Sequence, residues 1–311
     1  MKSRLSKPQR YQTTTRSRWR WLRWLFIIGG LLIVVSLTAG SIIAITTYRK
    51  LAVGLPSIAE LEDYQPSLVT KVFARDGELI ADFFIERRFL VSLDEIPLYM
   101  QQATLAVEDT RFYSHRGFDP IGVLRAIRVN FRAGKIKEGA STITQQVART
   151  LFLTPERTFT RKLREIILAR RIEQRFSKDQ ILEMYLNQIF YGHNAYGVEA
   201  AAQNYFGKSV QKLDLGEAAL IAGLSSAPNR YSPLNNLELS LQRRQHVLRR
   251  MVDAGYLTPE RAEAIQQQSV HLNPHKQQIN KAPYFVEYVR RHLEEQYGAT
   301  ALYRGGFNVY T

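Results

Sequence analysis

The chain has 311 residues, 45% of them hydrophobic, so it is long enough for one large domain or two smaller ones around a real core. Its formal net charge of +15 favours an anionic partner, such as nucleic acid, an anionic membrane surface or a phosphorylated substrate. There is no cysteine, which excludes disulfides, thiolate metal sites and cysteine nucleophiles.

The first 48 residues predict a basic arm and a membrane anchor. Residues 1–23 carry eight basic side chains and no acidic one, which predicts a disordered cytoplasmic arm. Residues 24–48 hold no charged side chain and are long enough to cross a bilayer as a helix. The positive-inside rule then places the N-terminus inside and the rest of the chain on the outer face of the cytoplasmic membrane, periplasmic or extracellular. A signal peptide cut near Ala39-Gly40-Ser41 is the alternative, although the apolar run is longer than is typical for one.

A small β element and a helical domain are predicted next. Residues 49–68 form a linker, residues 69–74 alternate as a strand, Asp76-Gly77 is a strong hairpin turn, and residues 78–84 return as a second strand. From there to about residue 270 nearly all of the sequence has a helical pattern. We therefore expect a mainly α-helical domain over residues 69–270.

One predicted helix contains Glu108, the candidate catalytic residue. Ser92 and Asp94 can cap its N-terminus, Pro97 fits its first turn, and Gly117 would mark its end.

The spacing of Glu108, Phe112 and His115 would bring these three side chains towards one face of such a helix. The apolar run before Glu108 would partly desolvate its side chain. Desolvation makes a carboxylate a better base. The alternative is that Glu108 is a solvated helix residue and that Phe112 is only part of the core.

Residues 119–137 interleave apolar side chains with five basic ones. Such a stretch could enter the outer face of a membrane. An ordinary amphipathic helix over a core is the alternative.

Residues 139–146 combine a glycine with hydroxyl and amide side chains, a composition that opens a helix and leaves its N-terminal amides directed at solvent or at an anion. The cations that follow strengthen this prediction, because several cations near a helix N-terminus can hold a diphosphate. They are Arg149, Arg157, Arg161 and Lys162. Lys162 and Glu165 lie on one helix face at i,i+3. The alternative for this pair is a surface ion pair, and the alternative for the glycine segment is an ordinary helix cap.

These stretches belong to a series of ordered motifs. The motifs are Glu108-Asp109-x-x-Phe112-x-x-His115-x-Gly117, Gly139-x-Ser141-Thr142-x-Thr144-Gln145-Gln146, Arg161-Lys162-x-x-Glu165, Tyr185-Leu186-Asn187 with Tyr191-Gly192 and Tyr196-Gly197, and Glu217-Ala218-Ala219 with Ala227-Pro228 and Tyr231-x-Pro233. From about residue 69 to about residue 258 the chain therefore resembles the peptidoglycan glycosyltransferase family, that is, the glycosyltransferase domain of class A penicillin-binding proteins and the monofunctional transglycosylases. Arg149 stands where lysine is common in that family.

The resemblance implies a mainly helical, lysozyme-like glycosyltransferase fold with a larger head and a smaller membrane-proximal jaw that includes residues 119–137. It implies an enzyme of bacterial cell-wall synthesis that polymerises lipid II, a disaccharide-pentapeptide on a polyprenyl diphosphate, into glycan strands. The reaction would invert the anomeric carbon and release polyprenyl diphosphate, with no organic cofactor. The implied partners are lipid II, the growing lipid-linked strand, the membrane and cell-wall elongation or division proteins. We expect no nucleic acid partner, because the predicted anchor places the rest of the chain outside the cytoplasmic membrane.

The resemblance also assigns roles to individual residues. Glu108 would remove the proton from the acceptor sugar hydroxyl, and Glu165 would assist near the donor diphosphate, directly or through a divalent cation, Mg²⁺ or Mn²⁺. The expected donor-site residues are Ser141, Thr142, Gln146, Arg149, Arg157 and Lys162. The expected supporting residues of the first motif are Asp109, Phe112, His115 and Gly117.

Two other functions remain open. One is a lysozyme-like lytic enzyme, which would use Glu108 as a general acid. Such a hydrolase does not need the basic residues of the chain, whereas a transferase needs them to stabilise a leaving lipid diphosphate. A membrane-anchored scaffold without catalysis would bind anionic lipid or a division protein through its basic surface.

Residues 271–311 are expected to be a linker. In bifunctional family members a similar stretch leads towards a penicillin-binding transpeptidase domain, which is not present in this chain. Within it, residues 283–297 predict a helix and residues 305–311 the start of a strand. Ser209-x-x-Lys212 matches one transpeptidase pattern, but no Lys-Thr-Gly accompanies it, so we expect no transpeptidase activity.

Overall fold

The computed structural model describes residues 16–57, 60, 68–84, 86–135, 139–154, 156, 158–274 and 282–311. The chain divides into two units, residues 1–54 and residues 55–311, and each is described by itself.

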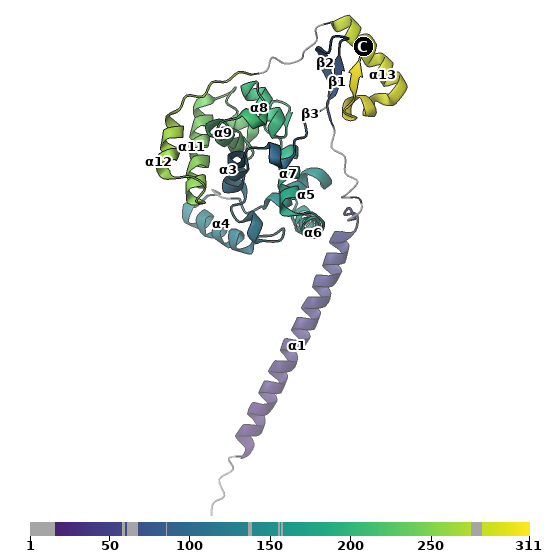
Figure 1. Ribbon diagram of the computed structural model, residues 1–311. Helices are drawn as coiled ribbons and strands as arrows, with labels where there is room; N and C mark the ends of the chain where they lie inside the picture. Colours follow the sequence, from purple (N-terminus) through teal and green to yellow (C-terminus); the bar gives the residue numbers. More distant parts are fainter. Residues whose placement is uncertain are drawn as a thin grey trace, which may run out of the picture. The chain divides into compact units, whose positions relative to one another are not determined.

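The first unit contains one long helix, α1 (Arg16–Ala52), drawn in purple in Figure 1. Within Arg23–Ala52 the mean hydropathy reaches 2.4, and none of that apolar window is buried by the protein. By length and composition this helix can cross a membrane, and it includes the predicted anchor over residues 24–48. The predicted disordered arm is wrong for residues 16–23, which are helical because arginine and leucine are good helix formers. Residues 1–15 of that arm lie outside the described residues.

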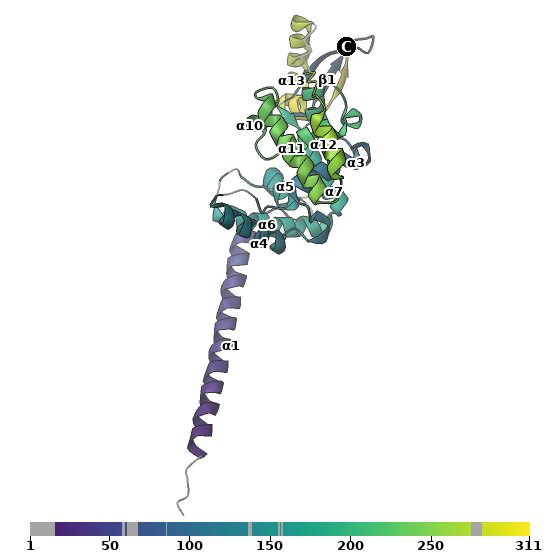
Figure 2. The same ribbon diagram turned by 90° about the vertical axis from the view of Figure 1, so that its left-hand side faces the viewer.

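The second unit is mainly helical, as predicted (Figures 1 and 2). Its main helices are α3 (Leu98–Glu108), α4 (Pro120–Ala133), α5 (Ile143–Phe152), α6 (Phe159–Arg175), α7 (Lys178–Gln188), α8 (Val198–Phe206), α9 (Leu215–Leu224), α10 (Pro228–Tyr231), α11 (Leu237–Asp253) and α12 (Pro259–Gln267). The apolar helix α9 is buried along almost its whole length, and α3 and α11 pack against it and against each other. Helix α5 packs against α6 and α7, and one hydrophobic core joins both groups.

Short elements connect these helices. They are three 3-10 helices, η1 (Leu93–Glu95), η2 (Phe112–Ser114) and η3 (Val210–Lys212), and a parallel pair of strands, β3 (Arg87–Arg88) and β4 (Ala195–Tyr196).

The predicted β hairpin is confirmed. Strands β1 (Thr70–Phe73) and β2 (Leu79–Phe83) pair antiparallel, with Thr70 opposite Phe83. A third strand, β5 (Asn308–Tyr310), pairs parallel to β1 on its other side.

The prediction of a linker over residues 271–311 needs a correction for its described part. Residues Pro283–Arg304 form α13, which bends at Gly298, and α13 shares a small hydrophobic core with β1 and β2. Strand β5 pairs with β1, so residues 282–311 form a folded structure together with the β1–β2 hairpin. The helix predicted over residues 283–297 and the strand predicted within residues 305–311 are confirmed. Their packing against β1 and β2 was not predicted, because it joins segments far apart in the sequence.

The start of α3 also differs from the prediction. Ser92 precedes η1, where its backbone N–H donates to Glu95 Oε2 at 2.9 Å, and α3 begins only after Pro97. The residue before a proline is restricted to extended backbone, and Ile96 adopts that conformation, which separates η1 from α3.

Candidate active site

Glu108 is the last residue of α3, and its carboxylate lies between α5 and the end of α9. Gln146 Nε2 of α5 donates a hydrogen bond to Glu108 Oε2 at 2.6 Å. The hydroxyl of Ser225, directly after α9, donates to Oε1. Both oxygens of this half-buried carboxylate therefore accept a hydrogen bond, which fixes the orientation of the Glu108 side chain.

The predicted helix does not continue past Glu108, because Asp109 leaves the helical conformation with φ −158° and ψ 75°. The Asp109 carboxylate pairs with His115 Nε2 at 2.9 Å and accepts a hydrogen bond from the backbone N–H of Ile143 at 3.1 Å. Phe112 is buried in the core. Phe112 and His115 thus do not share a face with Glu108; they stabilise the loop that follows it.

Gly117 and Thr142 connect that loop to the start of α5. Gly117 has φ +84°, and a Cβ there would lie 2.9 Å from the backbone oxygen of Ala169, so only glycine fits. The Thr142 hydroxyl donates to the Gly117 carbonyl at 2.8 Å and accepts the backbone N–H of Gln145 as the cap of α5. Thr142 is buried and positions α5.

Lys162 of α6 is held against the N-terminal end of α5. Its ammonium group donates to Ser141 Oγ at 2.8 Å, to Gln145 Oε1 at 2.9 Å and to Glu165 Oε2 at 2.9 Å. Arg161 donates to the other oxygen of Glu165, whose side chain is only 1% exposed. Glu165 therefore positions Lys162 and Arg161 through a buried ion-pair cluster.

A cavity of about 520 Å³ opens beside Glu108. Its wall consists of Val107, Glu108, Thr110, Arg125, Gly139, Ser141, Gln146, Arg149, Ser226, Ala227, Tyr231, Arg243, His246 and Arg250. Glu108 is the one carboxylate among these lining residues, and four of them are arginines. The cavity thus combines a single carboxylate with a cationic wall.

The structure brings together most of the predicted site. Ser141, Gln146 and Arg149 line the cavity with Glu108, and Lys162 reaches it through its hydrogen bond to Ser141. The predicted donor-site residue Arg157 lies outside the described residues.

Several residues at this site were not predicted from the sequence. Arg243 and Arg250 on α11 line the cavity, and Ser225 binds Glu108 directly. Tyr185 and Tyr191 lie near Glu108 in the core: burial raises the pKa of both hydroxyls far above the usual range, and the charge of Glu108 adds to the effect. The motifs contained both tyrosines, but nothing in the sequence placed them beside Glu108.

The comparisons with known proteins assign the chain to a family. A family model described as Transglycosylase matches residues 76–252 of the 311, which include every residue that lines the cavity. The chain belongs to the transglycosylase family.

Curated relatives of this transglycosylase are named penicillin-binding protein 1A. The Escherichia coli protein is 46% identical over 89% of this chain and 32% of its own length, and the Aquifex aeolicus protein is 44% identical over 92% of this chain and 39% of its own length. A solved structure of penicillin-binding protein 1A from Haemophilus influenzae aligns with 80% of this chain and 27% of its own, at 29% identity and a TM-score of 0.48. This chain spans about a third of the length of the curated relatives it matches.

The surroundings of Glu165 do not suit a divalent metal ion as they stand. Both carboxylate oxygens are occupied by cations, and the described part of the transglycosylase contains no group of three or more histidine, aspartate and glutamate side chains arranged to hold a metal. The divalent cation stays a prediction from the resemblance.

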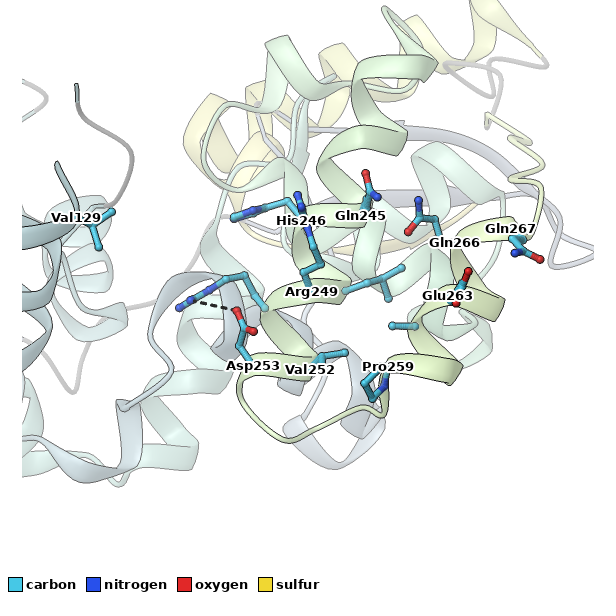
Figure 3. Close-up of a pocket in the computed structure, with 13 residues that line it drawn as sticks. Val129, Gln245, His246, Arg249, Val252, Asp253, Pro259, Glu263, Gln266 and Gln267 are labelled. Atoms are coloured by element: carbon cyan, nitrogen blue, oxygen red, sulfur yellow. Dashed lines mark ion pairs between the residues drawn. The ribbon is translucent and has the colours of Figure 1, made fainter. Parts of the chain in front are cut away.

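A second cavity, of about 930 Å³, lies beside α11 and α12 (Figure 3). Its labelled side chains include Gln245 and Arg249 of α11 and Glu263 and Gln266 of α12. It shares His246 and Arg250 with the cavity beside Glu108 but does not contain Glu108. The larger of these two cavities therefore does not contain the candidate catalytic residue.

Proposed function

We propose that this transglycosylase is a peptidoglycan glycosyltransferase that polymerises lipid II into glycan strands in bacterial cell-wall synthesis. The observation that carries the proposal is the cavity in which Glu108, held by two donors, faces a wall with four arginines. Membership of the transglycosylase family and the resemblance to penicillin-binding protein 1A support it.

In the proposed reaction Glu108 removes the proton from the acceptor sugar hydroxyl. The electron pair of that oxygen forms the new bond to the anomeric carbon of the lipid-linked strand, with inversion. The bond from the anomeric carbon to the diphosphate oxygen breaks, and the diphosphate leaves with the bonding electrons. Cations fixed in place before the reaction stabilise the charge that develops on it.

Arg149 and Lys162 are the candidates for that stabilisation. Arg149 lines the cavity one helical turn after Gln146 on α5. Lys162 lies next to this wall and donates to Ser141, which lines the cavity, while Glu165 fixes its position through an ion pair. Because these groups are preorganised, they lose little free energy to reorganisation during the reaction.

The cationic wall favours a transferase over the lytic enzyme. A glycosidase must protonate a poor sugar-oxygen leaving group, so it needs a carboxylic acid that stays neutral. A wall of arginines instead suits an anionic leaving group, whose charge it can stabilise.

The outer face of α4 supports a membrane-bound substrate. Four apolar side chains on α4 are more than half exposed: Ile121, Leu124, Ile127 and Phe131. Gly122 and Ala126 face the protein instead, and Arg125, Arg128 and Arg132 alternate with the exposed apolar residues. We propose that this face enters the outer surface of the cytoplasmic membrane as part of the jaw.

With α1 as the anchor, the catalytic unit would lie on the outer side of the membrane and the N-terminus inside. Tethering confines enzyme and lipid-linked substrates to one surface, which lowers the entropic cost of their encounter. Cell-wall elongation or division proteins are the partners proposed for such an anchored enzyme.

The test is to incubate the full-length protein in detergent with labelled lipid II and to separate the products on a gel. The proposal predicts a ladder of long glycan strands. Release of soluble fragments from preformed cell wall, without polymer from lipid II, would support the lytic enzyme instead. No product in either assay would support the scaffold.

A further inference from the structure

Ser225 joins the end of α9 to the catalytic carboxylate. We propose that Ser225 is a positioning residue whose hydroxyl pairs with Glu108 both before and after Glu108 takes up the substrate proton. The proposal rests on the function proposed above, in which Glu108 is the base.

Two acceptors lie within hydrogen-bond distance of the Ser225 hydroxyl, and the hydroxyl of Tyr185 lies beside it as well. One is Glu108 Oε1, and the other is the backbone carbonyl of Ala222, at 2.8 Å on the last turn of α9. A serine hydroxyl has one hydrogen and two acceptor lone pairs, so it can donate to one of these groups while it accepts from a third. Rotation about the Cβ–Oγ bond of Ser225 switches the donation between the two.

Before the reaction Glu108 is charged, and the hydroxyl of Ser225 donates to Oε1. Hydrogen bonds to an ionised acceptor are about twice as strong as neutral ones. Gln146 holds the other oxygen with a second donor. The two bonds come from different helices, so together they fix the carboxylate in the cavity wall.

During the reaction the acceptor O–H bond breaks, its electron pair joins the anomeric carbon, and the proton moves to Glu108. A protonated carboxyl group needs an acceptor. The amide nitrogen of Gln146 can only donate, whereas Ser225 can turn its hydrogen to the Ala222 carbonyl and accept from Glu108. The acid form of Glu108 therefore keeps a hydrogen-bond partner without movement of the backbone.

The test compares Ser225→Thr with Ser225→Val in the full-length protein in detergent, with labelled lipid II as substrate. Threonine and valine have nearly the same shape, and only threonine keeps the hydroxyl. We expect Ser225→Val to lower kcat about ten-fold with little change in KM, and Ser225→Thr to stay within about two-fold of the parent.

Each outcome decides the proposal. Equal kcat for the valine variant and the parent would overturn it. Equal losses of kcat in the valine and threonine variants would also overturn it, because they would indicate a packing effect. If Ser225→Val lowers the unfolding temperature, Ser225→Ala replaces it, since alanine adds no volume, and the same comparison applies. If the parent itself makes no polymer, the proposed function fails, and this inference fails with it.

Discussion

Replacement of Glu165 by glutamine tests whether this residue acts by holding Lys162. Glu165 is 1% exposed, and its two oxygens pair with Arg161, whose side chain is 16% exposed, and with Lys162, whose side chain is 37% exposed. Glutamine keeps the size of the side chain but removes the charge that both cations face.

The expected loss of stability in Glu165→Gln follows from the burial of the ion pairs that Glu165 forms. Removing one partner of a fully buried ion pair costs about 3–5 kcal/mol of stability. Water can still solvate the half-exposed Lys162, so we expect the lower end, a loss of about 3 kcal/mol. The assay is urea unfolding of the full chain in detergent, followed by circular dichroism. Glu295→Gln, at an exposed position of α13, is the matched control and should stay within about 0.5 kcal/mol of the parent.

A double-mutant cycle separates positioning from an independent catalytic role. If Glu165 acts through Lys162, then Glu165→Gln added to Lys162→Met should slow polymerisation little further than Lys162→Met alone. A loss of stability below about 1 kcal/mol in Glu165→Gln would refute the energetic argument. Rate losses that multiply in the double variant would refute the positioning role.

Two further predictions concern other parts of the structure. Tyr205→Phe should lower the free energy of unfolding by about 1–2 kcal/mol, because the Tyr205 hydroxyl donates to the Tyr191 carbonyl at 2.7 Å. Tyr191→Phe should lower it by less than about 0.5 kcal/mol, because the buried Tyr191 hydroxyl has no partner among the described residues. Equal losses for the two variants in urea unfolding would contradict this. The chain has no cysteine, so a single introduced cysteine can carry a polarity-sensitive dye. In lipid vesicles the dye on Phe131→Cys should report an apolar environment, and the same dye on Glu260→Cys of α12 should report water. Identical emission from the two variants would contradict the membrane role of α4.

Local sequence patterns predicted the elements whose causes are local. The turn at Asp76-Gly77 and the alternation around it predicted the β1–β2 hairpin, and the apolar run after the basic arm predicted α1. The composition of the glycine-hydroxyl segment predicted the start of α5, where Thr142 is the cap. In each case the decisive interactions join residues a few positions apart.

Features that depend on distant residues were missed. Helical spacing predicted that α3 would run past Glu108, but Asp109 leaves the helix to bind His115 and the first amide of α5. Ser225 lies 117 positions from Glu108 and meets it only because α9 packs against α3. Such contacts depend on how the helices pack, which the pattern within one helix does not reveal.

The central claim is that Glu108 is the base of a lipid II polymerase. The most direct measurement compares the full-length protein with its Glu108→Gln variant on labelled lipid II, after both are shown to unfold at the same temperature. Glutamine keeps the size of the side chain but cannot accept the substrate proton. We expect long glycan strands from the parent and a loss of at least about 100-fold in the variant. Polymer from the variant at the rate of the parent would contradict the claim.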